Sequence, residues 1–189
     1  DGSLLNPFLT IQKAIDTAEA LAPSSSNRFI IRVGVGSYNE NLTFTSGYTT
    51  LLGDSGTFKS SNTIINGDIS LVGANAEDLY NCIVAIQGFT ILGGIVDTKT
   101  NSHTLNITNC NIYYADRGVY QNSTGADSRT SLFNTSLNSS NDTATDPTIE
   151  VANGWLDMVN CRLSTEASRS LIVASGTGVI IRAIQILLE

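Results

Sequence analysis

The sequence has few charged residues, and basic residues are the scarcer kind. Lysine, arginine, aspartate and glutamate make up 14% of the 189 residues, against roughly 25% in an average soluble domain. Ten basic and 17 acidic side chains give a formal net charge of −7. Nucleic acids and anionic membranes are bound through clustered positive charge, so we expect neither class of partner.

Long apolar runs, prolines and metal-binding cysteine motifs are also scarce or missing. No apolar run approaches the roughly 18 residues of a membrane-spanning helix. Only three prolines are present, and the three cysteines form no C-x-x-C motif. We therefore predict no zinc site and, more generally, no metal and no cofactor.

What is abundant points to β-structure with polar turns. Hydrophobic residues make up 41% of the chain, which is enough for a core and excludes wholesale disorder. Serine, threonine, asparagine and 16 glycines take the place of the missing charge. At this length, one domain is the default expectation.

Six segments fit one eight-residue frame that repeats along the chain. The clearest pair is LNITNCNI, which starts at Leu105, and LDMVNCRL, which starts at Leu156. Equivalent positions lie 21 to 26 residues apart, which suits one coil of a β-solenoid and is too short for paired helices. The other four segments start at Asn62, Val84, Thr130 and Val179.

Apolar residues occupy the third and eighth positions of this frame. Residues on one face of a strand are an even number of positions apart, so this interval of five means that the alternation is interrupted once between them. The interruption at the fifth position indicates a corner where one strand ends and the next begins. We predict that the corner asparagines form an interior ladder, although asparagine also favours ordinary turns. The ladder residues are Asn66, Asn109, Asn134 and Asn160, with Gly88 and Ala183 in the other two copies.

The first 28 residues differ from the rest. The run PFLTIQKAIDTAEALA places Ile11, Ile15 and Ala18 on one helical face, and a strand pattern follows from Phe29. We predict that this helix covers the open end of the first coil. The expected organisation is one β-helix domain over 1–189, with a cap and lead-in at 1–28 and coils at 29–189.

The last segment, VIIRAIQILLE, is apolar almost to its end. We interpret the chain as a fragment of a longer polypeptide whose next segment, or a partner, covers these residues. The alternative is a buried C-terminal strand of a complete domain.

Together, DGSLLNPFLTIQKAID at the N-terminus, FIIRVGVGSYNENLTF after it and the N-C-x-[IL] coils resemble a known superfamily. They look like the right-handed parallel β-helix proteins of the pectate-lyase-like superfamily. The resemblance covers essentially the whole chain and implies that fold. That superfamily includes pectate and pectin lyases, pectin methylesterases, polygalacturonases, phage tailspikes and viral spike or fibre proteins, so the fold does not fix an activity.

No enzyme of that superfamily is matched residue by residue. The QD and DFxFG stretches of the methylesterases and the NTD, GHG and RIK motifs of the polygalacturonases are absent. Weak catalytic candidates are Asp97, Asp116 and Glu150, which a lyase would use to hold Ca²⁺ beside a basic residue. The alternative for these acids is ordinary solvated loop positions. The single histidine, His103, has no metal-ligand pattern around it.

Aromatic side chains near the coils suggest a glycan-binding surface, because aromatic faces pack on sugar rings. The candidates are Tyr113, Tyr120 and Trp155, and packing into the core or a subunit seam is the alternative. Cys110 and Cys161 lie two coils apart, about 9–10 Å, which is too far for a disulfide. We expect buried, reduced thiols.

These observations favour a non-enzymatic structural or glycan-binding module of a virion spike, fibre or minor capsid protein. The expected location is the virion surface, with virion or surface proteins, a polysaccharide or a second copy as partners. A polysaccharide lyase or hydrolase is the alternative, and only that alternative brings Ca²⁺. An extracellular or cell-surface adhesin is the third hypothesis.

Overall fold

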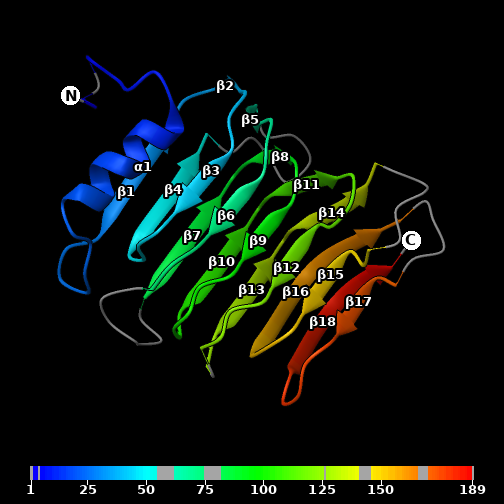
Figure 1. Cartoon of the computed structure of the whole chain (residues 1–189). Helices are drawn as coiled ribbons and strands as arrows, with labels where there is room; N and C mark the ends of the chain where they lie inside the picture. Colours follow the sequence, from blue (N-terminus) through cyan, green and yellow to red (C-terminus); the bar gives the residue numbers. More distant parts are fainter. Residues whose placement is uncertain are drawn as a thin grey trace.

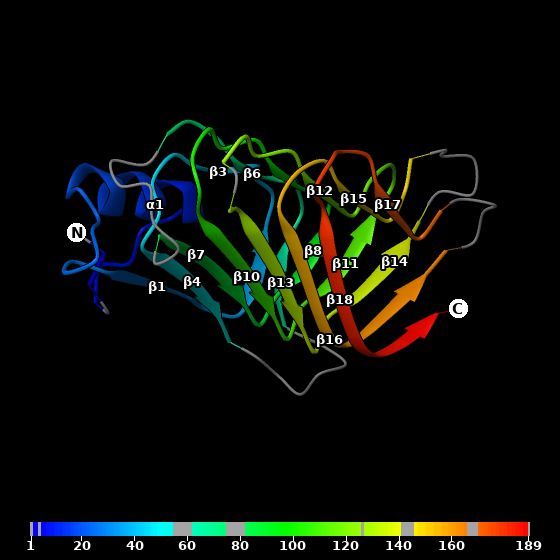
Figure 2. The ribbon, with the colours of Figure 1, turned by 90° about the horizontal axis from the view of Figure 1, so that it is seen from below.

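The computed structural model describes residues 2–3, 5–54, 62–74, 82–125, 127–140, 146–165 and 170–188. It shows a parallel β-solenoid with one short helix at its N-terminal end, which confirms the predicted fold class (Figure 1). Coils stack along one axis, so the helix and the last strand lie at opposite ends (Figure 2). Within these ranges, no helix has the length and apolar character needed to cross a membrane.

The strands form three walls around the interior. The first wall stacks β1 (Phe29–Val33), β4 (Thr49–Gly53), β7 (Ile83–Gln87), β10 (Thr104–Thr108), β13 (Arg129–Phe133) and the first parts of β16 (Trp155–Ser164) and β18 (Ile180–Leu188). The second wall stacks β2 (Gly36–Tyr38), β5 (Thr63–Ile65), β8 (Thr90–Leu92), β11 (Asn111–Tyr114), β14 (Ser136–Ser139) and the second parts of β16 and β18. The third wall stacks β3 (Leu42–Phe44), β6 (Ile69–Leu71), β9 (Ile95–Asp97), β12 (Val119–Gln121), β15 (Ile149–Val151) and β17 (Ile172–Ala174).

Each wall buries alternate residues, and the buried residues of successive coils lie in register. Fully burying one such apolar side chain contributes about 1.5–3 kcal/mol, so stacked columns dominate the stability of the solenoid. On the first wall the central column is Leu51, Ile86, Ile107, Leu132 and Met158, and on the second it is Ile65, Ile91, Ile112, Leu137 and Leu163.

A residue with positive φ forms the corner between the first and second walls. This left-handed backbone is open to glycine and, among other residues, is adopted most readily by asparagine. The strand alternation restarts after this residue, as the sequence frame predicts. The corner residues are Gly88 (φ 78°), Asn109 (53°), Asn134 (47°), Asn160 (53°) and Gln185 (54°).

The predicted frame is wrong at both ends of the solenoid. Asn66 is not a corner residue, because it follows β5 on the second wall, where Ile65 pairs with Ile91. The coil from Leu51 to Ile86 spans 35 positions and includes 55–61 and 75–81, which lie outside the described residues. A fixed spacing in the low twenties therefore selected the wrong strand.

At the C-terminal end the frame is displaced by two residues. Met158 pairs with Ala183, and the corner falls at Gln185 instead of Ala183. Alternating apolar residues fit a strand equally well after a shift of two, so VIIRAIQI gave no signal that separates the two registers.

Helix α1 (Ile11–Ala20) closes the N-terminal end. Thr10 is its N-cap and accepts a hydrogen bond from the Lys13 N–H at 3.2 Å. Ile11, Ile15 and Ala18 are its buried residues, which confirms the predicted face. The helix packs against β1 and β3, the first strands of the first and third walls.

Polar side chains of α1 also satisfy the backbone of the segment that contains β3. The Gln12 amide accepts from the Thr43 N–H at 2.7 Å and donates to the Thr43 carbonyl at 3.1 Å. The Glu19 carboxylate accepts from the N–H groups of Thr45 (2.7 Å) and Ser46 (2.9 Å). In return, Glu40 accepts from the first N–H groups of the helix, at 2.8 and 2.9 Å.

Candidate functional site

Asp97 lies inside the solenoid instead of on its outer surface. It is 1% exposed and aligns with the buried Gln121 of the next coil. Its Oδ2 lies 2.7 Å from Nε2 of His103, which is also buried. Nδ1 of His103 lies 3.0 Å from the Asn101 carbonyl, which can only accept, so Nδ1 carries a hydrogen. The two side chains lie within hydrogen-bonding distance of each other, and the pair is closed to solvent.

A buried lysine completes this interior polar cluster. Lys99 Nζ donates to the carbonyls of Thr45 (2.9 Å) and Val72 (3.2 Å), which belong to the two preceding coils. Burial lowers the pKa of Lys99, while the nearby Cys82, Asp97 and Glu19 act in the opposite direction. The cluster therefore joins coils along the solenoid axis and has no access for a substrate.

The other two candidate acids do not join Asp97. Glu150 lies on the outer face of the third wall, 3.4 Å from Arg117, which also contacts Asp146 at 3.3 Å. Asp116 is exposed in the turn after β11. No three of the histidine, cysteine and acidic residues in the described ranges are grouped so as to hold a metal ion. The three acids predicted as weak catalytic candidates are thus dispersed.

The three candidate aromatic residues lie on three different walls. Trp155 is on the first wall, Tyr113 on the second and Tyr120 on the third. They do not form one glycan-binding surface. Their separation follows from the coil register, because consecutive strands of one coil belong to different walls.

Two of these rings already have a cationic side chain over them. The guanidinium groups of Arg129 and Arg182 lie 5.3 and 5.2 Å from the Trp155 ring centre, and Asp157 holds both arginines, at 3.2 and 2.6 Å. Arg117 lies 4.3 Å from the Tyr120 ring centre.

Tyr113 has an open position instead. It is 43% exposed on the outer face of the second wall. Its in-register neighbours are Leu92, which is 46% exposed, and Asn138. An exposed ring between an apolar side chain and an amide offers both a stacking face and hydrogen-bonding groups.

The corner asparagines are linked by their side chains. Asn134 donates to the Asn109 Oδ1 at 3.2 Å, and Asn160 donates to the Asn134 Oδ1 at 2.7 Å. Asn109 and Asn134 are half-buried and Asn160 is exposed, so this chain of amides follows a solvent-facing corner and not the interior. Asn66 instead donates to Asn39 and Ser37 on the second wall.

The three cysteines are buried thiols that form no disulfide, as expected. Cys110 and Cys161 directly follow the corner residue, and each thiol lies near one carbonyl oxygen of its own coil and one of the preceding coil. In the coil between them, Thr135 occupies the same position, and its hydroxyl group contacts the equivalent carbonyl oxygens. Burial raises the pKa of Cys110 to about 11 and also raises that of Cys161. The column therefore has a structural role, with thiols that stay protonated near neutral pH.

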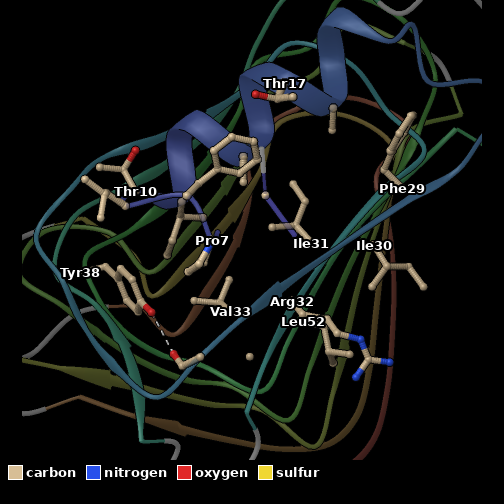
Figure 3. Close-up of a pocket in the computed structure, with 18 of the residues that line it drawn as sticks. Pro7, Thr10, Thr17, Phe29, Ile30, Ile31, Arg32, Val33, Tyr38 and Leu52 are labelled. Carbon is tan, nitrogen blue, oxygen red and sulfur yellow. Dashed lines mark hydrogen bonds between the residues drawn. The ribbon is translucent and has the colours of Figure 1, made fainter. Parts of the chain in front are cut away.

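An open groove at the N-terminal end was not foreseen from the sequence. It measures about 1100 Å³ and lies between α1, the segment before it and β1. Figure 3 shows Ile31 and Val33 pointing from β1 toward the helix, while Ile30 and Arg32 point to the other side of the strand. The alternating run FIIRV was the available signal, since it places Phe29, Ile31 and Val33 on the side of β1 that faces the helix. The groove offers mainly apolar contact and no grouped acids or bases.

No family model, no curated protein and no solved structure matches this chain. The parallel β-solenoid and its local geometry are therefore the basis for any functional assignment.

Proposed function

We propose that the chain is a non-enzymatic β-helix module that binds a glycan on the outer face of its second wall. The observation that supports this is the exposed Tyr113 ring between Leu92 and Asn138. A sugar ring stacked on Tyr113 would place its hydroxyl groups beside the Asn138 amide. The neighbouring coils continue this wall on both sides, so an extended polysaccharide can follow it.

The proposal separates Tyr113 from the other two aromatic candidates. Trp155 lies between two guanidinium groups, and Tyr120 lies under Arg117. A sugar that stacked on either ring would have to displace a cation held in place by a carboxylate. Tyr113 needs no such rearrangement.

We further propose that the module belongs to the pectate-lyase-like superfamily and serves in a virion spike, fibre or minor capsid protein. The resemblance of its opening and of its N-C-x-[IL] coils to that superfamily supports this assignment, and the parallel solenoid is consistent with it. The location would then be the virion surface, with other virion proteins as neighbours. An extracellular or cell-surface adhesin would use the same wall in the same way.

Glycan binding is tested with a glycan array followed by titration calorimetry on the strongest hit. Tyr113→Ala should abolish binding, whereas Tyr120→Ala should leave it within about twofold, a change of roughly 0.4 kcal/mol. Equal losses in the two variants, or no binding by the unchanged protein, would contradict the proposal.

An activity assay separates the module from an enzyme. The unchanged protein is incubated with pectin, alginate and host-wall polysaccharides, with and without Ca²⁺, and new reducing ends and unsaturated products are measured. We expect no turnover. Product formation that depends on Glu150 would support the lyase or hydrolase alternative, and detection of the chain in purified virus particles would support the virion assignment over the adhesin.

A further inference from the structure

The coil that follows the interior polar cluster carries four polar side chains on the inside of one corner. This corner joins β12 on the third wall to β13 on the first wall. All four residues are fully buried. They are Gln121, Ser123, Ser128 and Thr130, and we call this set the polar corner.

Four oxygen atoms of the polar corner have neither contact with solvent nor a hydrogen-bond partner among the described residues. They are Gln121 Oε1 and the hydroxyl oxygens of Ser123, Ser128 and Thr130. The other end of the Gln121 amide is satisfied, because Nε2 donates to the carbonyls of Ser128 (3.2 Å) and Asn153 (2.9 Å). These carbonyls can only accept, so they fix which end of the amide is the oxygen. Buried polar groups are nearly always hydrogen-bonded, and an unpaired one is destabilising.

We propose that the polar corner is a binding site for buried water, which bridges the Gln121 amide oxygen and the three hydroxyl groups. A buried water typically makes about three hydrogen bonds to protein groups that otherwise have no partner. The proposal is independent of glycan binding, because the polar corner lies inside the solenoid and the glycan surface lies outside it.

Side-chain size leaves room for water at this corner. The pairing of β9 with β12 and of β10 with β13 puts the polar corner in register with the coil before it. Three of the aligned positions have a smaller side chain than in that coil, and the turn between the two serines is one residue longer. The site therefore combines polar atoms with space, which are the two requirements for a buried water. The residues Ser123, Ser128 and Thr130 take the places of Lys99, His103 and Leu105.

The aligned side chains of the neighbouring coils do not meet the needs of the polar corner. Both ring nitrogens of His103 already have partners, in Asp97 and the Asn101 carbonyl. The Lys99 side chain is directed to the other side, where Nζ donates to carbonyls of the two coils before it. These neighbours are thus engaged elsewhere or carry no polar group, which favours water as the partner. In the following coil the aligned residues are Val151, Gly154 and Leu156.

The donor and acceptor groups of the polar corner distinguish water from a metal cation. Each hydroxyl group has a hydrogen to donate as well as lone pairs that accept, whereas Gln121 Oε1 only accepts. A cation would contact the oxygens but would give the three hydroxyl hydrogens no acceptor, and none of the four groups carries a charge to offset its own. A water molecule donates and accepts, so it meets both needs.

A high-resolution crystal structure of the 189-residue chain tests the site directly. We expect an ordered water within hydrogen-bonding distance, about 2.5–3.0 Å, of two or more of the four oxygens. Contacts of about 2.3–2.6 Å from six or more oxygens would identify a cation such as Ca²⁺ and overturn the proposal. A corner without such density, or one whose four groups are bonded only to each other, would overturn it as well.

A matched pair of variants tests the site in solution. Thr49 and Thr130 lie in the same interior column of the first wall, and both are buried. The Thr49 hydroxyl donates to the Gly47 carbonyl at 3.3 Å, a partner within the protein. Thr49→Val should lower the urea concentration at the midpoint of unfolding, and Thr130→Val should lower it too, because both remove a hydrogen-bonded hydroxyl group.

The sign of the Thr130→Val effect is decisive. Thr130 lies between Leu105 and Leu156 in this column, so the position accepts an apolar side chain. A hydroxyl group without a partner would be better replaced by a methyl group. A midpoint that rises or stays unchanged in Thr130→Val, while Thr49→Val lowers it, would overturn the proposal.

Discussion

The first and last described coils of the solenoid each have a neighbouring coil on one side only, and the two ends differ in what covers the other side. At the N-terminal end, α1 covers the first coil with Ile11, Ile15 and Ala18 and supplies hydrogen bonds to the segment around β3 through Gln12 and Glu19. At the C-terminal end, β18 has comparable apolar residues and neither kind of cover within the described residues. At the N-terminal end, one amphipathic helix therefore provides both apolar contact to the first coil and hydrogen-bonding partners for the backbone around β3.

The strongest test places the same substitution at both ends. Ile15→Asp puts a charge into a fully buried site of the cap and should abolish soluble folding. Ile181→Asp puts it at a position that is 40% exposed on the interior side of the last strand, where folding should persist. Soluble yield and thermal unfolding followed by circular dichroism measure the difference. Similar yields would mean that α1 is not needed to close the solenoid.

A smaller effect is expected when only the hydrogen bonds of the cap are removed. Glu19→Ala leaves the N–H groups of Thr45 and Ser46 without their acceptor and should lower the free energy of unfolding by about 1–3 kcal/mol. Lys13→Ala, on the exposed side of the same helix, serves as the control. Urea unfolding gives both values, and equal values would show that apolar cover alone closes this end.

The corner column allows a comparison between the middle of the solenoid and its open end. Asn134→Ala removes two amide hydrogen bonds at a positive-φ position and should lower the free energy of unfolding by about 1–3 kcal/mol. Gln185→Ala changes the equivalent corner of β18, which has one neighbouring strand, and should cost under about 0.5 kcal/mol.

Asn134→Gly separates the two causes in the middle coil. Glycine adopts the left-handed backbone without strain but lacks the side-chain amide. Asn134→Gly should therefore lower the free energy of unfolding, but by less than Asn134→Ala does. Equal costs for the alanine and glycine variants would assign the whole effect to the amide hydrogen bonds.

A further predicted effect concerns Cys110 and appears only at alkaline pH. The folded pKa is about 11 against an ordinary value of 9.0, so between these values the unfolded chain loses the thiol proton while the folded chain keeps it. The contribution of this group to the free energy of unfolding therefore falls as the pH rises from 9 to 11. Cys110→Thr, which repeats the residue found at Thr135 in the same column, should be nearly neutral at pH 7 and should reduce this decline.

The fold was predictable because its signal is repeated in every coil. The frame around Asn109, Asn134 and Asn160 gave the correct corner, and the apolar columns on either side followed from it. The ends were not predictable from the same pattern. At the N-terminal end, the coil from Leu51 to Ile86 is longer than the others, so a regular spacing does not apply. At VIIRAIQI, a shift of two residues preserves the alternation, so only the backbone pairing shows that the corner is Gln185 and not Ala183.

The candidate site was harder to predict than the fold because it depends on which wall each residue faces. Asp97 aligns with Gln121, the neighbour of the outward Tyr120, so the register of the third wall was enough to place it inside. Its pairing with His103 could not be read from spacing, because the loop between them sets that contact. The open position of Tyr113 depended in the same way on knowing that Arg117 and Arg129 lie over other rings.

Because of Lys99, resistance to a pulling force should differ along the solenoid. Its side chain runs along the axis and its ammonium group bonds to carbonyls of the two preceding coils. If the two chain ends are pulled apart, the later coils can peel away one strand at a time, each step breaking one row of hydrogen bonds. The first three coils are fastened together by this lysine, so they should resist as one block and yield last, in a single larger extension.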